Sequence, residues 1–294
     1  GELLELLPKG SHGEDILEES LMYLEIDRCA NVAEMNVLVR ELEQVLDEVR
    51  IAVADFEPMK VKINELLAGI DTLEFAVEEG EKSEVKVFLQ WLVDNHFTFL
   101  GYEEFEVRND NGGGYLVYDE SSFLGLTKLL RAGLTKEDLH IEDYAVNYLQ
   151  EPMLLSFAKA AHPSRVHRPA YPDYVSIRKI DATGKVIKEC RFMGLYTSSV
   201  YGESVRQIPY IRRKVAEVER RSGFDAKAHL GKELAQVVEV LPRDDLFQTP
   251  VDELFSTVMS IVQIQERNKI RVFLRKDPYR SEEHTSELQS PVRS

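Results

Sequence analysis

The residues with the clearest chemical potential lie in the segment HPSRVHRPAY, at positions 162–171. Arg165, His167 and Arg168 stand close together there, and Arg178 follows in the next predicted strand. Arginine guanidinium groups bind carboxylates through paired hydrogen bonds. We therefore predict that Arg165, His167, Arg168 and Arg178 form either an anionic-ligand site or a contact between domains.

Two other functions for this segment are less favoured. A metal site at His162 and His167 would need further Cys, His or carboxylate ligands that converge on them, so structural or anion-contacting roles are preferred. Cys190 could act as a thiol nucleophile with one of these histidines as its base. Its position inside a predicted strand favours a small buried residue instead.

Cofactor sites of the common nucleotide-binding kinds are absent from the sequence. No Gly-x-Gly-x-x-Gly or P-loop motif stands between a strand and a helix. The run NGGG at 111–114 precedes a strand, which favours a hairpin turn. The basic run at 206–221 is interrupted by Glu217 and Glu219, so we interpret it as a solvated helix face. The sequence therefore predicts no catalytic, cofactor-binding or metal-ligating residue in this chain.

The elements that must position the arginines have a mixed α+β order. Alternating apolar residues predict four strands, at 97–107, 115–119, 174–181 and 186–201. Helices are expected at 122–131 and 135–150, between the second and third strands. This order is typical of an antiparallel sheet with helices on one face, an architecture that can form a ligand cleft.

Before this sheet we expect a strand and several helices. The strand covers 20–27, with Met22, Leu24 and Ile26 on one face. Asn31 and Glu34 have the spacing of a capping box. The helix that they open should bury one apolar stripe, made of Leu38, Leu42, Val45, Leu46, Val49 and Val53. A helical stretch at 58–80 follows, and Ser83 is expected to cap a helix over 84–95.

After residue 203 the pattern is mainly helical. One helix should end at Gly223, and the next is marked by Leu230, Leu234, Val237, Val238 and Leu241. Thr249, Pro250 and Asp252 have the types expected at the start of a third helix. A strand is then expected at 269–276.

Composition limits the cellular setting and the partners. The chain has 294 residues, of which 44% are hydrophobic, and a formal net charge of −16. Such a charge disfavours binding to nucleic acid or to an anionic membrane. The two cysteines, Cys29 and Cys190, have no metal-ligand or disulfide-framework spacing, which favours a reducing compartment. We predict a cytoplasmic protein without a membrane span.

Several strings resemble one protein family in order along residues 19–279. They are ESLMYLEIDR, FLQWLVDNHFTFLGYEEFEV, SRVHRPAYPDYVSIRKIDATGKVIKECRFMGLYTSSVY, IPYIRRKVAEVERRSG, LPRDDLFQTPVDELF and QERNKIRVFLRKDPY. Each closely resembles a segment of the large bacterial NAD-specific glutamate dehydrogenases. The resemblance implies a fragment from the N-terminal regulatory region, which in that family carries ACT-type amino-acid-binding modules and a PAS-type domain.

The resemblance also implies a division into modules and a set of partners. Its expected parts are the C-terminal part of an ACT-like module (1–57), a helical linker (58–83), a PAS-like α+β domain (84–202), a helical segment (203–267) and the first strand of a following ACT-like module (268–279). The catalytic domain and its NAD would lie elsewhere in the parent chain, so no catalytic residue is carried over. Expected partners are the rest of that chain, further copies in a homo-oligomer and an amino-acid effector. The alternative is an independent small-molecule sensor or oligomerisation module without catalytic activity.

The last residues, 280–294, differ from everything before them. RSEEHTSELQS at 280–290 resembles one reading frame of a common sequencing adapter. We predict that 280–294 is a non-native tail that contributes almost nothing to folding; the alternative is a natural polar terminus.

Overall fold

The structure is a computed structural model of the chain. It describes residue 13 and the ranges 22–70, 79–110, 113–132, 153–181, 183–264, 272–276 and 283–286. The chain divides within its first helix into two compact units, Gly1–Glu43 and Gln44–Ser294.

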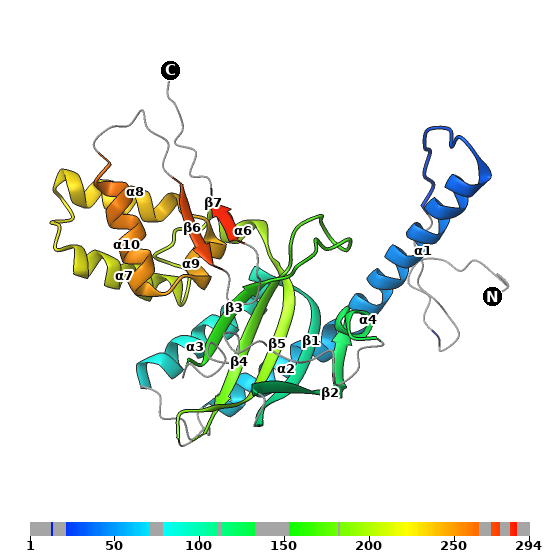
Figure 1. The fold of residues 1–294 in the computed structure, drawn as a ribbon, viewed down its shortest axis with the longest axis horizontal. Coiled ribbons are helices and arrows are strands. Elements are labelled where there is room, and N and C mark those ends of the chain that lie inside the picture. The colour runs from blue at the N-terminus through cyan, green and yellow to red at the C-terminus, as the bar shows by residue number, and fades with distance from the viewer. Residues whose placement is uncertain are drawn as a thin grey trace. The chain divides into compact units, whose positions relative to one another are not determined.

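One five-stranded antiparallel sheet organises the second unit (Figure 1). Its spatial order is β2-β1-β5-β4-β3. The strands are β1 (Phe97–Asp110), β2 (Gly113–Gly125), β3 (Leu155–Lys159), β4 (Asp173–Ile180) and β5 (Val186–Tyr196). The predicted α+β class is confirmed, and so are the four predicted strands, except that the strand expected at 186–201 ends at Tyr196 and residues 198–201 are helical. Strand β3 was not predicted, because four of its five residues in succession are buried and so show no alternation.

A bulge in β1 changes which side chains share a face. The pairing of β1 with β5 shifts register between Phe99 and Gly101. Phe99 then contacts the ring of Phe192, whereas the ring of Phe105 lies against the guanidinium of Arg191. Arg191 and Phe192 are neighbours in β5, so their side chains point to opposite faces of the sheet. Phe99 and Phe105 therefore lie on opposite faces of the sheet although six positions separate them, because a bulge inserts one extra residue into the alternation.

Two helices cover one face of this sheet (Figure 1). They are α2 (Phe56–Gly69) and α3 (Glu79–Trp91). Their buried residues join those of the sheet in one hydrophobic cluster that includes Met59, Phe88 and Phe192. Val85, Phe88 and Leu89 form the buried face of α3, and Leu92 directly after the helix continues it; each of these residues is at most 1% exposed.

The ends of several elements differ from expectation. Helix α3 begins at Glu79 rather than after Ser83, because the charged residues before Ser83 are themselves good helix formers. It gives way to a wide turn, η2 (Leu92–His96), in which Asn95 has φ 65°. Residues 122–125 extend β2 instead of forming a helix, and the last two of them, Leu124 and Gly125, pair with β1. Only α4 (Thr127–Leu130) is helical there, and the helix expected at 135–150 lies outside the described residues.

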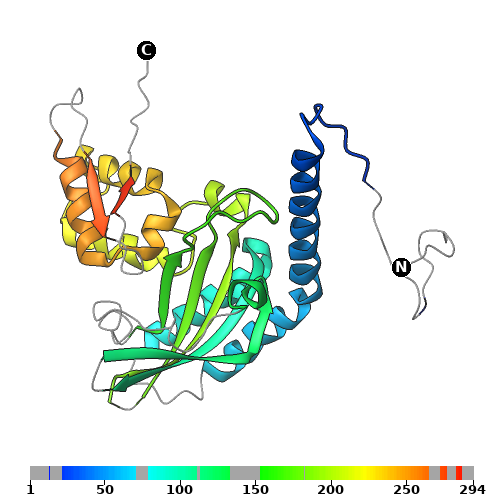
Figure 2. The same ribbon diagram turned by 45° about the vertical axis from the view of Figure 1, so that its right-hand side comes forward.

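A group of helices packs beside β3, coloured yellow to orange in Figure 2. After α6 (Ser198–Gly202), the group comprises α7 (Ile211–Ser222), α8 (His229–Val240), α9 (Arg243–Gln248) and α10 (Val251–Val262). Gly223 ends α7 in the left-handed conformation, as predicted. Of the apolar residues that mark α8, Leu234 and Val238 are buried, whereas Leu230 in its first turn is 45% exposed. Pro250, not Thr249, precedes the first residue of α10, and the Thr249 carbonyl is instead bound by Lys214.

The start of the chain departs most from expectation. Residues 22–29 have no regular structure, and Met22, Leu24 and Ile26 are 57% to 64% exposed. None of the strands that the structure describes pairs with this segment, and an unpaired strand leaves its backbone groups to water. The expected strand at 20–27 is therefore wrong for its described part.

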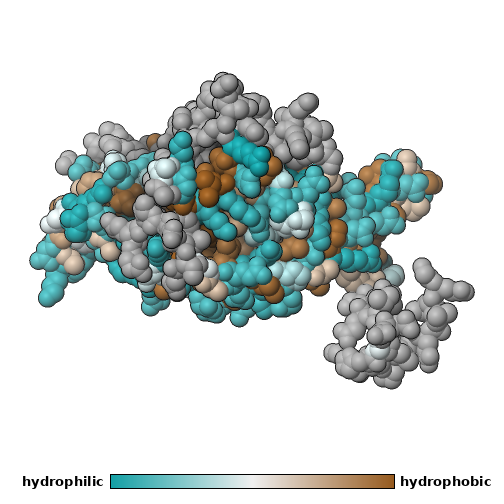
Figure 3. Space-filling model, turned by 90° about the horizontal axis from the view of Figure 1, so that it is seen from below, coloured by the Kyte–Doolittle hydropathy of each residue, from teal (hydrophilic) through white to brown (hydrophobic). Residues whose placement is uncertain are grey.

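Helix α1 (Val32–Ala54) begins as predicted but does not bury its stripe. The Asn31 side chain accepts a hydrogen bond from the amide of Glu34, and Glu34 accepts one from the amide of Ala30. Leu42 is 41% exposed and Val53 is 70% exposed. On the face seen in Figure 3, brown apolar residues are likewise scattered among teal hydrophilic ones.

Two short strands close the described chain. Strand β6 (Phe273–Lys276) pairs antiparallel with β7 (Glu283–Ser286). β6 confirms part of the strand expected at 269–276, and β7 lies within the stretch that resembles an adapter. The non-native origin of 280–294 stays a prediction. Among the described residues no helix is both long and apolar enough to cross a bilayer.

Candidate functional site

The four residues singled out from the sequence lie on two elements. Arg165, His167 and Arg168 belong to the loop between β3 and β4, and Arg178 belongs to β4. The loop is held by short-range hydrogen bonds, such as that from the Ser164 hydroxyl to the Val166 carbonyl at 2.9 Å. His167 is exposed and has φ 70°, so it sits at a sharp turn.

Each of the arginines has different surroundings. Arg165 pairs with Glu48 in the last turns of α1. Arg168 donates from Nη2 to the Tyr196 carbonyl at 2.7 Å, while its Nε is buried without a hydrogen-bond partner. Arg178 is fully buried and pairs with Glu189 at 3.0 Å. The described contacts therefore bring these side chains to three separate places.

Arg178 belongs to a chain of ion pairs that we call the sheet ion network. It consists of Glu103, Arg131, Arg178, Glu189 and Arg191. Glu103 accepts two hydrogen bonds from Arg131, at 2.7 and 2.9 Å, and Arg191 bridges Glu103 at 3.4 Å and Glu189 at 2.8 Å. Both carboxylates are 0% exposed, so they must be paired to stay ionised.

The charges of the sheet ion network favour the ionised form of Glu189. Burial opposes ionisation of Glu189, but the guanidinium groups of Arg191 and Arg178 lower its pKa below the usual value. Arg191 also lies 4.6 Å from the ring centre of Phe105, and Arg131 lies 4.9 Å from that of Tyr118. Groups held in this way stabilise one arrangement of the strands and are poorly suited to transfer protons.

A second group, which we call the lysine–aspartate cluster, consists of Lys159, Asp173 and Asp244. The Lys159 ammonium lies 2.8 Å from a carboxylate oxygen of Asp173 and 2.8 Å from one of Asp244. It also donates to the Tyr171 carbonyl at 3.4 Å. The other oxygen of each carboxylate, Asp173 Oδ2 and Asp244 Oδ1, is buried without a hydrogen-bond partner.

Asp173 has an unusual affinity for a proton. It is 4% exposed, and burial raises its pKa to about 7; the negative charge of Asp244 adds to this effect. Lys159 and Arg168 act in the opposite direction. Although burial opposes it, the two aspartates raise the pKa of Lys159, so the lysine stays charged.

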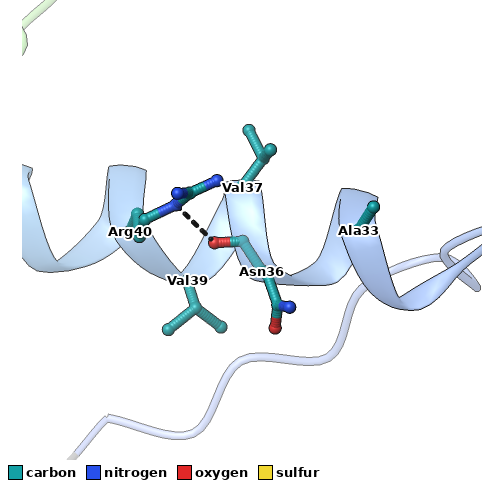
Figure 4. A pocket seen from close by; sticks show the side chains of 5 residues that line it. All are labelled: Ala33, Asn36, Val37, Val39 and Arg40. Atoms are coloured by element: carbon teal, nitrogen blue, oxygen red, sulfur yellow. Dashed lines mark hydrogen bonds between the residues drawn. The ribbon is translucent and has the colours of Figure 1, made fainter.

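The surface of α1 contains a shallow hollow that is a poor candidate for a ligand site. It is lined by Ala33, Asn36, Val37, Val39 and Arg40. All five come from one helix and their side chains point in different directions, with a hydrogen bond from Arg40 Nε to the Asn36 carbonyl at 3.2 Å (Figure 4). Ligand sites are normally enclosed by several elements.

Metal and thiol chemistry find little support in the described part of the chain. Within the described ranges, no three His, Cys, Asp or Glu side chains come together as a metal site would require. Cys190 is 2% exposed, and burial raises its pKa, which keeps the thiol protonated. His162 is exposed. The prediction that Cys190 is a small buried residue is confirmed.

Sequence reasoning missed most members of the two charged groups. For the sheet ion network a signal was present: Glu189 and Arg191 alternate with Cys190 and Phe192 in one strand, so the charges share a face. No such signal exists for the lysine–aspartate cluster. Lys159 and Asp173 face each other across the pairing of β3 with β4, and Asp244 joins them because α9 packs on β3.

Comparison with known proteins gives consistent matches. The model of the family described as glutamate dehydrogenase, helical motif 1, matches residues 208–267, which include α7 to α10. The NAD-specific glutamate dehydrogenase of Pseudomonas aeruginosa is 72% identical over 279 residues, which are 95% of this chain and 17% of that protein. That of Halomonas elongata is 43% identical over 265 residues, which are 89% of this chain and 16% of the relative.

A more distant relative matches over a similar extent. The NAD-specific glutamate dehydrogenase of Mycobacterium tuberculosis is 26% identical over 279 residues, 94% of this chain and 16% of the relative. The chain thus spans 16% to 17% of the length of these relatives. Nearly the whole chain matches each of these three proteins, and all three are NAD-specific glutamate dehydrogenases. The chain therefore belongs to the NAD-specific glutamate dehydrogenase family and is a fragment of such a protein.

Proposed function

We propose that this chain is an N-terminal regulatory and assembly region of an NAD-specific glutamate dehydrogenase. In the parent protein, a catalytic domain outside this chain would convert L-glutamate, NAD and water to 2-oxoglutarate, ammonia and NADH. NAD would bind to that domain and not to this fragment. The parent would act in the cytoplasm as a homo-oligomer.

The main support is the 72% identity over 95% of the chain, which corresponds to only 17% of the relative. The residues themselves add a chemical argument. Hydride transfer needs a nicotinamide held against the substrate, and the sequence has no glycine-rich strand–turn–helix to bind the pyrophosphate. The two buried charged groups hold their members in ion pairs and present no reaction centre of that kind.

The module types are part of the same proposal. A single antiparallel sheet with the second part of α3 on one face suits a PAS-like sensory domain over 84–202, and α2, from the linker before it, covers the same face. The capped helix α1, with exposed apolar residues such as Val39 and Leu42, suits one element of an ACT-like module whose other parts lie elsewhere in the parent.

An activity measurement tests the division between regulation and catalysis. Purified chain at high concentration, with saturating glutamate and NAD, should give no absorbance at the reduced-cofactor band above a blank without protein. A full-length enzyme of the family is the positive control. Turnover that survives repurification and disappears on heating would mean that a dehydrogenase site exists in this chain, and the proposal would have to be abandoned.

A second proposed role, effector binding, rests on Arg168. Its Nε is a buried donor without a hydrogen-bond partner, and a carboxylate is the natural acceptor for it. An amino acid or dicarboxylic acid is therefore the effector class that we propose. In an independent sensor without an attached enzyme, the same site could serve the same ligand.

A further inference from the structure

The lysine–aspartate cluster joins two parts of the molecule. Lys159 is the last residue of β3 and Asp173 is the first of β4, whereas Asp244 belongs to α9. The sheet lies outside the segment that matches the helical motif, and α9 lies inside it. The Lys159 ammonium thus connects the sheet to the helical group through one hydrogen bond on each side.

Apolar packing holds the same junction. The ring of Phe247 in α9 stacks on Tyr196 of β5, with centres 4.9 Å apart and planes 9° apart. It also stacks on Phe157 of β3, with centres 5.1 Å apart. These apolar contacts do not depend on pH, so they hold α9 on the sheet equally at every pH, whereas the charged cluster can make the docking depend on pH.

We propose that the lysine–aspartate cluster is a proton-operated latch: a proton taken up by Asp173 tightens the docking of α9 on the sheet, and its loss loosens that docking. The proposal concerns this chain alone and does not depend on its role in a dehydrogenase.

The reason is the arrangement of charge around Asp173. Lys159 and Asp244 face it across the junction, Arg168 faces it from the loop before β4, and the phenols of Tyr196 and Tyr201 face it from β5 and α6. When Asp173 is ionised, two carboxylates compete for one ammonium, and each keeps a buried oxygen without a partner. When Asp173 is protonated, the repulsion from Asp244 is lost and Asp173 gains an O–H donor.

The direction of the effect follows from linkage. The folded-state pKa of Asp173, about 7, lies above its ordinary value of 3.8. The folded state therefore binds the proton more tightly than the unfolded state does. The stabilisation is fully present below pH 3.8 and is lost as the pH rises through 7.

The first test measures the unfolding equilibrium of the full chain by urea denaturation at pH 5.5 and pH 8.0. Asp173→Asn removes the titration but keeps the shape of the side chain. In the wild type, the titration of Asp173 should raise the unfolding constant on the order of 30-fold between pH 5.5 and pH 8.0. This part of the pH dependence should be missing in Asp173→Asn. Glu120→Gln, which changes an exposed carboxylate of β2, is the matched control and should keep the wild-type pH dependence.

The second test locates the effect. Hydrogen exchange of the α9 amides, corrected for the intrinsic pH dependence of exchange, should show lower protection at pH 8.0 than at pH 5.5 in the wild type. This difference should shrink in Asp244→Asn, which removes the neighbouring negative charge while Asp173 remains. If Asp173→Asn keeps the full wild-type pH dependence, or if α9 protection does not change with pH in the wild type, the latch does not exist.

Discussion

At the level of single residues, buried charges are satisfied by more than one partner. Lys214 in α7 is 9% exposed, and its ammonium donates to the carbonyls of Leu246, Phe247 and Thr249 at 3.1, 2.6 and 3.0 Å. These carbonyls come from the last turn of α9 and the residue after it, where helices have unpaired acceptors. One lysine therefore caps a helix that sequence reasoning did not foresee.

Removing this ammonium should destabilise the fold. Lys214→Met keeps the length of the side chain but leaves buried carbonyls without their donor, so the free energy of unfolding should fall by about 2 kcal/mol. Urea denaturation measures the change. Lys227→Met, at an exposed position, is the control and should be nearly neutral. Equal effects of the two substitutions would show that the contacts of Lys214 contribute nothing.

Arg168 provides the residue-level test of effector binding. If its buried Nε donates a hydrogen bond to a carboxylate ligand, calorimetric titration of the wild type with amino and dicarboxylic acids should give heats that Arg168→Ala lacks. Arg165→Ala, which changes a partly exposed arginine paired with Glu48, should retain them. Equal heats for wild type and Arg168→Ala across these compounds would remove the idea and leave a structural role for Arg168.

At the level of elements, close approach of backbones fixes the helical group. A side chain at Gly231 in α8 would place its Cβ 2.1 Å from the Asp225 carbonyl oxygen, so the loop before α8 can pass there only because position 231 is glycine. At Gly69, the last residue of α2, a Cβ would meet no atom of the described residues within 4 Å. The two glycines form a natural comparison.

Alanine at these two positions should therefore act in opposite directions. Gly231→Ala should lower the free energy of unfolding by about 2 kcal/mol, because the loop or the helix must move. Gly69→Ala should be neutral or stabilise by up to about 1 kcal/mol, because alanine restricts the unfolded chain. Thermal or urea denaturation checks both, and a neutral Gly231→Ala would mean that the loop shifts without cost.

The elements also show what the sequence can and cannot predict. The capping pair Asn31 and Glu34, the Gly223 helix end and the β1–β2 hairpin depend on local signals, and the structure confirms them. Strand β3 gave no local signal, because it is buried on both faces and so lacks an alternation of apolar and polar residues. Helix α9 gave none because its six residues are too few to show a helical repeat of apolar residues. The lysine–aspartate cluster depends on tertiary packing, so no spacing in the sequence could have revealed it.

At the level of the molecule, the sheet and the helical group share one core. A single hydrophobic cluster runs from Met59 in α2 through Phe192 in β5 to Val258 in α10. It continues across the expected boundary between 84–202 and 203–267. A conformational change in the sheet can therefore be transmitted to the helical group through packed side chains. The proposed latch lies where the sheet and the helical group meet.

The residues 280–294 offer a simple test of which parts of the chain contribute to the stability of the whole fold. Among the described residues, the pairing of β7 with β6 covers Glu283–Ser286 against Phe273–Lys276, and a two-stranded ribbon by itself is marginally stable in water. The residues 280–294 have only Leu288 and Val292 as aliphatic side chains, so they can bury little apolar surface. Deleting 280–294 should leave the thermal midpoint unchanged in a differential scanning experiment. A fall of several degrees, equivalent to about 1 kcal/mol, would instead show that this segment docks on the fold and that its treatment as a non-native tail is wrong.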